Sequence, residues 1–161
     1  MSNFITIDYS SPLGIMEITG TEEAIYDISF TDKKQQTHPF QANIPAVLKM
    51  CYEELDDYFK GERRTFSVPY VYEGTEFQET VWHALTTVPY GETASYLDIA
   101  RAVNREKAVR AVGSTNGKNK LSIIVPCHRI IGANGKLTGY ASGLWRKKWL
   151  LAHEQNNLTE D

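Results

Sequence analysis

Apolar and polar residues alternate over the first thirty positions of the chain. Ile5, Ile7 and Tyr9 share one parity, and two further alternating runs, 15–18 and 24–30, follow after turn-forming residues at 10–14 and at Gly20. A period of two is typical of half-buried strands. We therefore predict three short antiparallel strands, followed by a polar loop over 31–43.

A helical period replaces the alternation after this loop. The helix is predicted to begin near Ile44-Pro45, where the missing N–H of proline costs little, and to end at Gly61. Its buried stripe follows the helical spacing and consists of Leu48, Cys51, Leu55 and Phe59.

Two capping boxes mark helix starts in the second half. Thr75–Gln78 opens a helix that Pro89-Tyr90-Gly91 stops, and Ser95–Asp98 opens a short helix through Val103. A third helix is predicted from about Glu106 to Val112, before Gly113. Short helices joined by a tight turn at Asn104 fit a helix-turn-helix motif.

An apolar segment, Leu121–Val125, is a candidate buried strand that runs into Pro126-Cys127-His128-Arg129. The predicted fold class is α+β: a small N-terminal antiparallel β-sheet plus helix domain over 1–73, then a mostly helical domain with the helix-turn-helix and the cysteine strand over 74–156. Residues 157–161 form a tail.

Composition removes several classes of protein. The chain of 161 residues is 42% hydrophobic and 23% charged, as in globular proteins. No apolar run approaches the roughly 20 residues of a membrane span, and the N-terminus lacks the features of a signal peptide. Two cysteines form no disulfide framework, so a cytoplasmic location is expected. No metal site is predicted, because CxxC and HxxxH spacings are absent.

Charge is unevenly distributed along the chain. Residues 1–74 hold 6 Lys/Arg and 12 Asp/Glu, whereas 75–154 hold 11 Lys/Arg and 6 Asp/Glu. The basic surplus coincides with the predicted helix-turn-helix, which favours a polyanion as partner. The supposed recognition helix, however, has small residues and one arginine over 108–114. Such a surface suits a protein that opens the duplex better than one that distinguishes base sequences.

Cys127 is the candidate nucleophile. A histidine and an arginine follow it, an arrangement in which the imidazole can take the thiol proton and cations favour the thiolate. From local chemistry alone, Cys127 could equally be a small buried hydrophobe, as Cys51 is expected to be on its helical stripe.

The segment 124–132, Ile-Val-Pro-Cys-His-Arg-Ile-Ile-Gly, resembles the active-site signature of the O6-alkylguanine-DNA alkyltransferases. Further landmarks agree in order and spacing: Pro89-Tyr90-Gly91, Ser95-Tyr96, Arg110–Gly113, Asn119, Gly139-Tyr140 and Trp149–Glu154. The resemblance covers 75–154 closely and the first 70 residues loosely. It implies an RNase H-like N-terminal domain and a similarity to bacterial members.

The resemblance implies a role for each residue of the site. Cys127 would attack the alkyl carbon on O6 of guanine, His128 would draw off the thiol proton through a water, and Glu154 would orient the imidazole. Asn119 would brace the turn that precedes the cysteine. Tyr140 would bond the flipped base and donate a proton toward it.

DNA contacts follow from the same resemblance. Arg110 would fill the gap that the flipped nucleotide leaves, and Tyr96 would press on the adjoining phosphate. The remaining residues of the expected DNA-binding set are Ala108, Ala111, Ser114 and Arg129. The guanine would be bordered by Tyr96, Tyr140, Ile130, Ala141 and Ser142. Ser142 stands where the family often has glycine and could narrow the pocket.

The implied function is direct repair of double-stranded DNA. An alkyl group would pass irreversibly from O6-alkylguanine to Cys127 of a monomer that needs no cofactor, a methylated-DNA–[protein]-cysteine S-methyltransferase that acts once. Activity on O4-alkylthymine is left open. The alternatives are a lesion sensor or DNA-binding regulator in which Cys127 is incidental, and a Cys-His hydrolase.

Overall fold

The computed structural model describes residues 3–158, so the last residues of the predicted tail, 159–161, lie outside the described part. Contacts divide the chain into two compact units. Within the described residues, the first unit comprises 3–73 together with 120–122, and the second comprises 74–119 together with 123–158.

The first unit is built on an antiparallel sheet with the strand order β1 (Ile5–Ser11), β2 (Gly14–Gly20) and β3 (Ile25–Phe30). The three predicted strands are thus confirmed. Gly14, with φ of 108°, makes the turn into β2, a conformation that glycine adopts without a steric cost. The register pairs Asp8 of β1 with Glu17 of β2, so both carboxylates lie on one face of the sheet.

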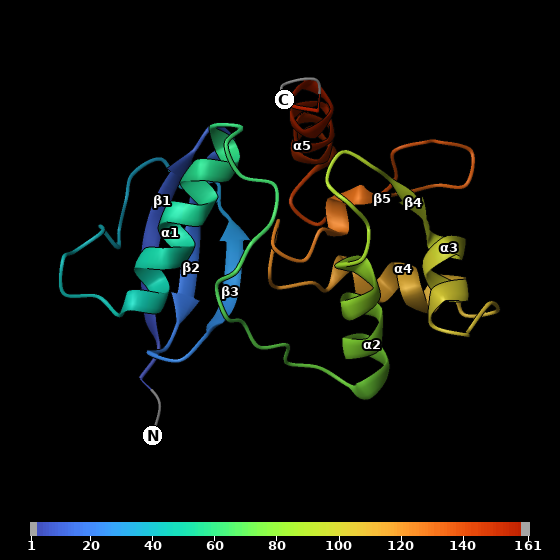
Figure 1. The fold of residues 1–161 in the computed structure, drawn as a ribbon, viewed down its shortest axis with the longest axis horizontal. Helices are drawn as coiled ribbons and strands as arrows, with labels where there is room; N and C mark the ends of the chain where they lie inside the picture. Colours follow the sequence, from blue (N-terminus) through green and yellow to red (C-terminus); the bar gives the residue numbers. More distant parts are fainter. Residues whose placement is uncertain (1–2, 159–161) are drawn as a thin grey trace. The chain divides into compact units, whose positions relative to one another are not determined.

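One helix, α1 (Ala46–Phe59), covers a face of this sheet (Figure 1). The predicted stripe is buried, and it packs with apolar residues from the strands to form the core of the unit. Gly61, with φ of 79°, follows the end of the helix as predicted. The buried residues that the strands contribute include Ile7, Tyr9, Met16, Ile18 and Ile28.

The predicted strand over 121–125 is wrong. Only a short stretch pairs with β3, where Ile28 donates to the carbonyl of Lys120 (2.8 Å) and accepts from the amide of Ser122 (3.2 Å). Ile123 then takes the left-handed conformation, with φ of 74°. A short apolar run indicates burial but does not distinguish a buried strand from a buried turn.

The second unit is mostly helical (Figure 1). Both predicted capping boxes are present, at Thr75 and at Ser95. Trp82 donates from Nε1 to the carbonyl of Thr115 (2.9 Å) and so joins the helix over 76–85 to the helix over 109–117. The elements are α2 (Glu76–Leu85), β4 (Ala94–Ser95), α3 (Tyr96–Ala102), α4 (Val109–Gly117), the 3-10 turn η1 (Cys127–Arg129), β5 (Ile130–Ile131) and α5 (Leu144–Asn156), with β4 and β5 parallel.

The helix expected over 106–112 lies further along the chain, at Val109–Gly117. Gly113 does not end it. Glycine costs a helix interior about 1 kcal/mol relative to alanine, and buried packing of Val112, Thr115 and Asn116 outweighs that cost here. The connection between α3 and α4 is consequently longer than predicted and spans 103–108.

None of the helices within residues 3–158 has the length and apolar character needed to cross a membrane.

Candidate active site

Cys127 begins the 3-10 turn η1 and is buried, with 5% of its surface exposed. Asn119 fixes the preceding turn, because its Nδ2 donates to the carbonyl of Val125 (2.9 Å) and to Sγ of Cys127 (3.2 Å). Asn116, one helical turn earlier, donates to the carbonyl of Cys127 (3.3 Å). The end of α4 therefore positions both the backbone and the thiol of the cysteine.

His128 and Glu154 form a buried pair beside the cysteine. Nε2 of His128 lies 2.7 Å from Oε2 of Glu154, and both side chains are fully buried. Nδ1 of His128 has no hydrogen-bond partner among residues 3–158. Because an ionised carboxylate only accepts, Nε2 carries the proton of the neutral ring and Nδ1 is left as a free base.

Glu154 is also held by Arg129 and by the backbone. Nε and Nη2 of Arg129 donate to the two carboxylate oxygens (2.8 and 3.1 Å), and the amide of Gly91 donates as well (3.2 Å). Nη1 of Arg129 donates to the carbonyl of Val88 (2.7 Å). This network joins α5, the cysteine turn and the segment 88–91 through one buried carboxylate.

Arg129, predicted above to bind DNA, is instead a buried structural residue. Its side chain is only 8% exposed and the guanidinium is occupied by Glu154 and the Val88 carbonyl. A buried carboxylate needs a charged partner, which is the role that Arg129 has in this structure. Sequence reasoning missed this, because Glu154 lies 25 residues away along the chain.

The electrostatics keep the thiol of Cys127 protonated and the imidazole of His128 neutral. Burial raises the pKa of the Cys127 thiol, and hydrogen bonding by Asn119 and the charge of Lys147 offset this only in part. Burial lowers the pKa of His128 despite the nearby Glu154. Burial alone would raise the pKa of Glu154, but His128 and Arg129 outweigh it and hold that pKa well below its ordinary range.

Sequence reasoning also missed Lys147, which is fully buried on α5. Burial lowers its pKa to about 8, and its interaction with Cys127 acts in the opposite direction. Nζ donates to the carbonyl of Thr138 (2.8 Å). The signal was available in the sequence, because Lys147 precedes the buried Leu150 and Glu154 by three and seven residues, on one face of a helix.

Tyr140 lies in the loop between β5 and α5, and its hydroxyl is buried. Burial and the neighbouring Cys127 raise the pKa of this hydroxyl well above its ordinary value. The hydroxyl therefore stays protonated at neutral pH and can donate a hydrogen bond. Of the other residues expected around the guanine, Ile130 is fully buried on β5, Ala141 is exposed and Ser142 is half-buried.

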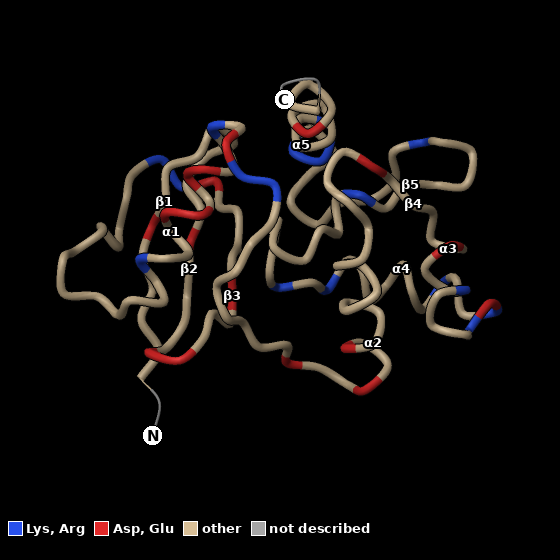
Figure 2. Tube along the Cα trace, viewed as in Figure 1, with Lys and Arg blue, Asp and Glu red and all other residues tan. Residues whose placement is uncertain are grey.

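The expected DNA-contacting residues of α4 share an exposed face. Arg110, Ala111 and Ser114 are exposed and Ala108 is half-buried, whereas Val112, Thr115 and Asn116 point into the unit. Basic residues gather at the turn between α3 and α4, while the sheet and helix of the first unit are rich in acidic ones (Figure 2). Tyr96 begins α3, and its ring lies near Gly113 of α4.

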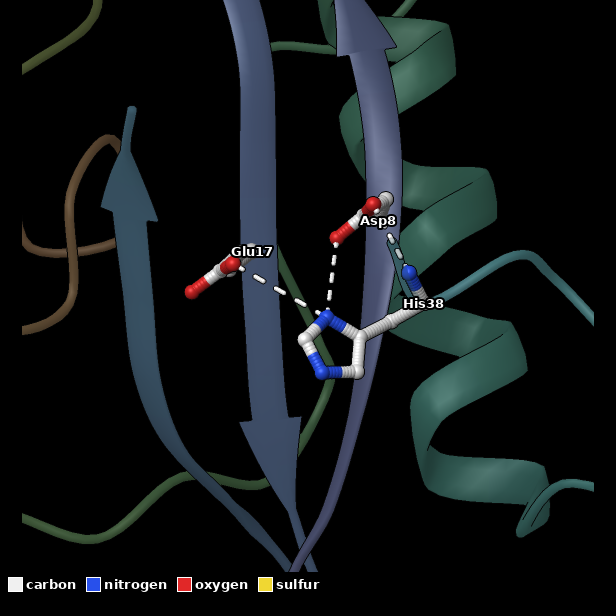
Figure 3. Close-up of side chains that lie close together, drawn as sticks. All are labelled: Asp8, Glu17 and His38. Carbon is white, nitrogen blue, oxygen red and sulfur yellow. Dashed lines mark hydrogen bonds and ion pairs between the residues drawn. The ribbon is translucent and has the colours of Figure 1, made fainter. Parts of the chain in front are cut away.

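A second cluster of titratable groups lies in the first unit, where Asp8, Glu17 and His38 have ligand-type atoms within 4.8 Å of one another (Figure 3). Lys33 occupies this cluster: its Nζ lies 2.8 Å from Asp8 and 2.7 Å from Glu17. Backbone amides of Thr37 and His38 donate to the other oxygen of the buried Asp8 (2.7 and 3.0 Å). The carboxylates are thus neutralised from within the chain, and the arrangement ties the 31–43 loop to the sheet.

Comparisons with known proteins agree with this geometry. The family model described as 6-O-methylguanine DNA methyltransferase, DNA binding domain, matches residues 76–156, and the model of the ribonuclease-like domain of the same protein matches 7–71. The methylated-DNA–protein-cysteine methyltransferase of Methanosarcina acetivorans is 45% identical over 148 residues, which cover 91% of this chain and 95% of that protein. The constitutive enzyme of that name from Bacillus subtilis is 46% identical over 136 residues, 81% of this chain and 82% of that protein.

Solved structures are similar over nearly the whole chain. The O6-methylguanine methyltransferase of Mycobacterium tuberculosis has a TM-score of 0.87 and 38% identity, covering 99% of this chain and 97% of that one. The M. tuberculosis protein OGT in complex with DNA has a TM-score of 0.83 and 42% identity, covering 96% and 93%. These likenesses confirm the predicted fold class and family resemblance: the chain belongs to the 6-O-methylguanine DNA methyltransferase family.

Proposed function

We propose that this protein repairs double-stranded DNA by moving the alkyl group of O6-alkylguanine to Sγ of its own Cys127. The sulfur forms a bond to the alkyl carbon while the bond from that carbon to O6 breaks. The thiol loses its proton, and the departing guanine gains one. The product is a thioether, which has no carbonyl for water to attack, so each molecule acts once and needs no cofactor.

The free Nδ1 of His128 is the observation that supports this chemistry best. Nδ1 is a buried ring nitrogen without a hydrogen-bond partner, on the residue that directly follows the buried, neutral thiol of Cys127. Such a nitrogen is costly to keep and is suited to take the thiol proton, directly or through a water. The Glu154 carboxylate on the opposite ring nitrogen stabilises the imidazolium that forms. Tyr140, which stays protonated because its pKa is raised, donates a hydrogen bond to the departing guanine. The proton that the guanine takes up is, in net terms, the one that the Cys127 thiol releases to His128.

Burial of Cys127 requires that the damaged nucleotide leave the duplex. The exposed face of α4 is nearly smooth and bears Arg110, which would fill the vacated position in the base stack. Tyr96, at the start of α3, would contact the neighbouring phosphate. The solved complex of the M. tuberculosis OGT with DNA supports DNA as the partner. Binding should weaken with salt and depend little on base sequence.

The reduced thiol that the chemistry needs favours a cytoplasmic location. A monomer is sufficient, since every group proposed for the reaction comes from one chain.

The test is the intact mass of the protein after incubation with excess duplex DNA that contains O6-methylguanine. We expect a gain of one methyl group, located on Cys127 by peptide mapping, with no further turnover. Cys127→Ala should gain none. Cys51→Ala is the matched control, because Cys51 is a buried residue of α1, and it should gain one methyl like the unsubstituted protein.

Tight binding to the lesion without a mass change would indicate a sensor and overturn the proposal. Many product molecules per protein would indicate a turnover enzyme and overturn it equally.

A further inference from the structure

The loop between β5 and α5 carries Tyr140, Ala141 and Ser142, and two side chains of α5 fix its backbone. Lys147 donates from Nζ to the carbonyl of Thr138 (2.8 Å), and Arg146 donates from Nη1 to the carbonyl of Ser142 (2.8 Å). The loop is the orange-to-red segment that precedes α5 in Figure 1. One side of the loop is thus attached to the helix that also provides Glu154.

On its other side the loop is attached through the side chain of Thr138. The hydroxyl of Thr138 lies 3.0 Å from the hydroxyl of Tyr96, and either group can be the donor. Tyr96 is the first residue of α3, its ring lies near Gly113 of α4, and Ser95 caps the helix directly before it. Its hydroxyl is therefore a well-placed anchor for the loop.

We infer that Thr138 is a positioning residue, which couples the guanine-binding loop to Tyr96 on the DNA-facing helices. This inference rests on the proposed function. When Thr138 donates to Tyr96, the tyrosine keeps its own proton for a phosphate oxygen, because a phenol can accept and donate at once. The loop that carries Tyr140 therefore stays in place while Tyr96 engages DNA, and the pocket is already shaped when the nucleotide arrives.

Lys136 gives a direct measure of this attachment. It is exposed in the same loop, two residues before Thr138, and its carbonyl accepts from the amide of Gly132 (2.9 Å). Trypsin cleaves after lysine only where the backbone opens, so the cleavage rate reports how often the loop detaches. Cleavage after Lys34, in the loop of the first unit, is an internal reference.

We expect Thr138→Val and Tyr96→Phe each to raise the relative cleavage rate after Lys136 by about three- to tenfold, the range that one hydrogen bond contributes to an equilibrium. The double variant should exceed neither single variant, since both remove the same bond. Thr138→Ser should restore slow cleavage, and Thr93→Val, at an exposed position of the same unit, should leave it unchanged. Equal cleavage in Thr138→Val and the unsubstituted protein would overturn the inference, as would a serine variant that behaves like valine.

Methyl transfer provides the second measurement. With saturating duplex containing O6-methylguanine, Thr138→Val should lower the first-order transfer rate about three- to tenfold and change the Kd for undamaged duplex less than twofold, with rescue by serine. If the unsubstituted protein transfers a methyl group and Thr138→Val matches its rate, this inference alone is wrong. If the unsubstituted protein transfers none, the proposed function is wrong, and the protease experiment still decides whether Thr138 holds the loop.

Discussion

Nε2 of His128 lies 2.7 Å from Oε2 of Glu154, inside a site where neither side chain is exposed. The carboxylate also binds Arg129 through both of its oxygens. The Glu154 carboxylate therefore binds one cation, Arg129, and one group that can become a cation, His128. It also determines which ring nitrogen of His128 has no hydrogen-bond partner. Stability and reactivity of the site are linked through this carboxylate.

Glu154→Gln should both destabilise the protein and slow methyl transfer. The substitution leaves a buried guanidinium without its anion, a loss that typically costs about 3–5 kcal/mol. Urea unfolding would measure the first effect and single-turnover methylation the second. Glu23→Gln, at an exposed position, is the control and should change neither. A Glu154→Gln variant as stable as the unsubstituted protein would show that Arg129 finds another partner.

Acid should destabilise the protein in two steps. The folded-state pKa of His128 is lowered from 6.5, so below about pH 6.5 the unfolded chain binds a proton that the folded chain does not, and stability falls with pH. The pKa of Glu154 is likewise lowered from 4.5, so its contribution is present above about pH 4.5 and is lost as pH falls through the folded-state value.

Urea unfolding at a series of pH values measures the first step. His128→Asn should flatten the slope between about pH 6.5 and 5, where one proton contributes at most about 1.4 kcal/mol per pH unit. His83→Asn, at an exposed position of α2, should leave the slope unchanged. Identical slopes in both variants would mean that His128 is not buried as a neutral base.

Asn119→Asp should make Cys127 less reactive. The amide donates to Sγ and to the carbonyl of Val125, and a carboxylate in its place accepts rather than donates and adds a negative charge beside the thiol. The pKa of Cys127 should rise further, and its alkylation by iodoacetamide should slow by about tenfold or more at neutral pH. Asn43→Asp, in the exposed loop of the first unit, is the control. Faster alkylation of Asn119→Asp would contradict the assignment.

Lys147→Met should change the pH dependence of the protein's stability and should also lower the reactivity of Cys127. The folded-state pKa of Lys147 is lowered to about 8, so the unsubstituted protein should gain stability as pH rises from about 8 toward 10.5, and the methionine variant should lack this rise. Cys127 should at the same time react more slowly, because a cation that favours the thiolate is lost. Urea unfolding at about pH 7 and 10 and iodoacetamide kinetics test both points. Lys148→Met, on the exposed face of α5, should show neither change.

Arg110→Ala should slow transfer more than it weakens binding. Nucleotide flipping costs a few kcal/mol, and the loss of an inserted side chain should reduce the transfer rate about tenfold or more at saturating duplex. Arg105→Ala removes an exposed charge from the turn before α4 and should affect mainly the salt dependence of binding. Similar losses of rate in both variants would argue that Arg110 contacts only phosphate.

The sequence predicts well those features that depend on local pattern. Alternation identifies β1 to β3, and the hydroxyl of Thr75 or Ser95 three residues before a polar side chain identifies the helix starts. The resemblance locates Cys127, His128 and Glu154. The end of α4 was misplaced because Gly113 is a local helix-breaking signal, and burial of neighbouring side chains outweighs it.

The features that the sequence did not predict correctly, or did not reveal, are ones that only tertiary contacts determine. Arg129 has the charge of a DNA contact, and its burial depends on Glu154 and on a carbonyl at position 88. The pairing between the hydroxyls of Thr138 and Tyr96 joins positions 42 residues apart. Neither relationship has a periodicity or a spacing that a single sequence would reveal.

Ile123 has the left-handed backbone conformation, which a β-branched residue avoids when the chain is free to choose. A short peptide with the sequence 119–129 would therefore relax to an extended form, and its cysteine would show the ordinary reactivity of a thiol in water. The burial and the raised pKa of the Cys127 thiol arise only when the helices around this segment have folded. If Cys127 is the nucleophile proposed above, partial unfolding would make its thiol reactive toward any electrophile or oxidant in the cell.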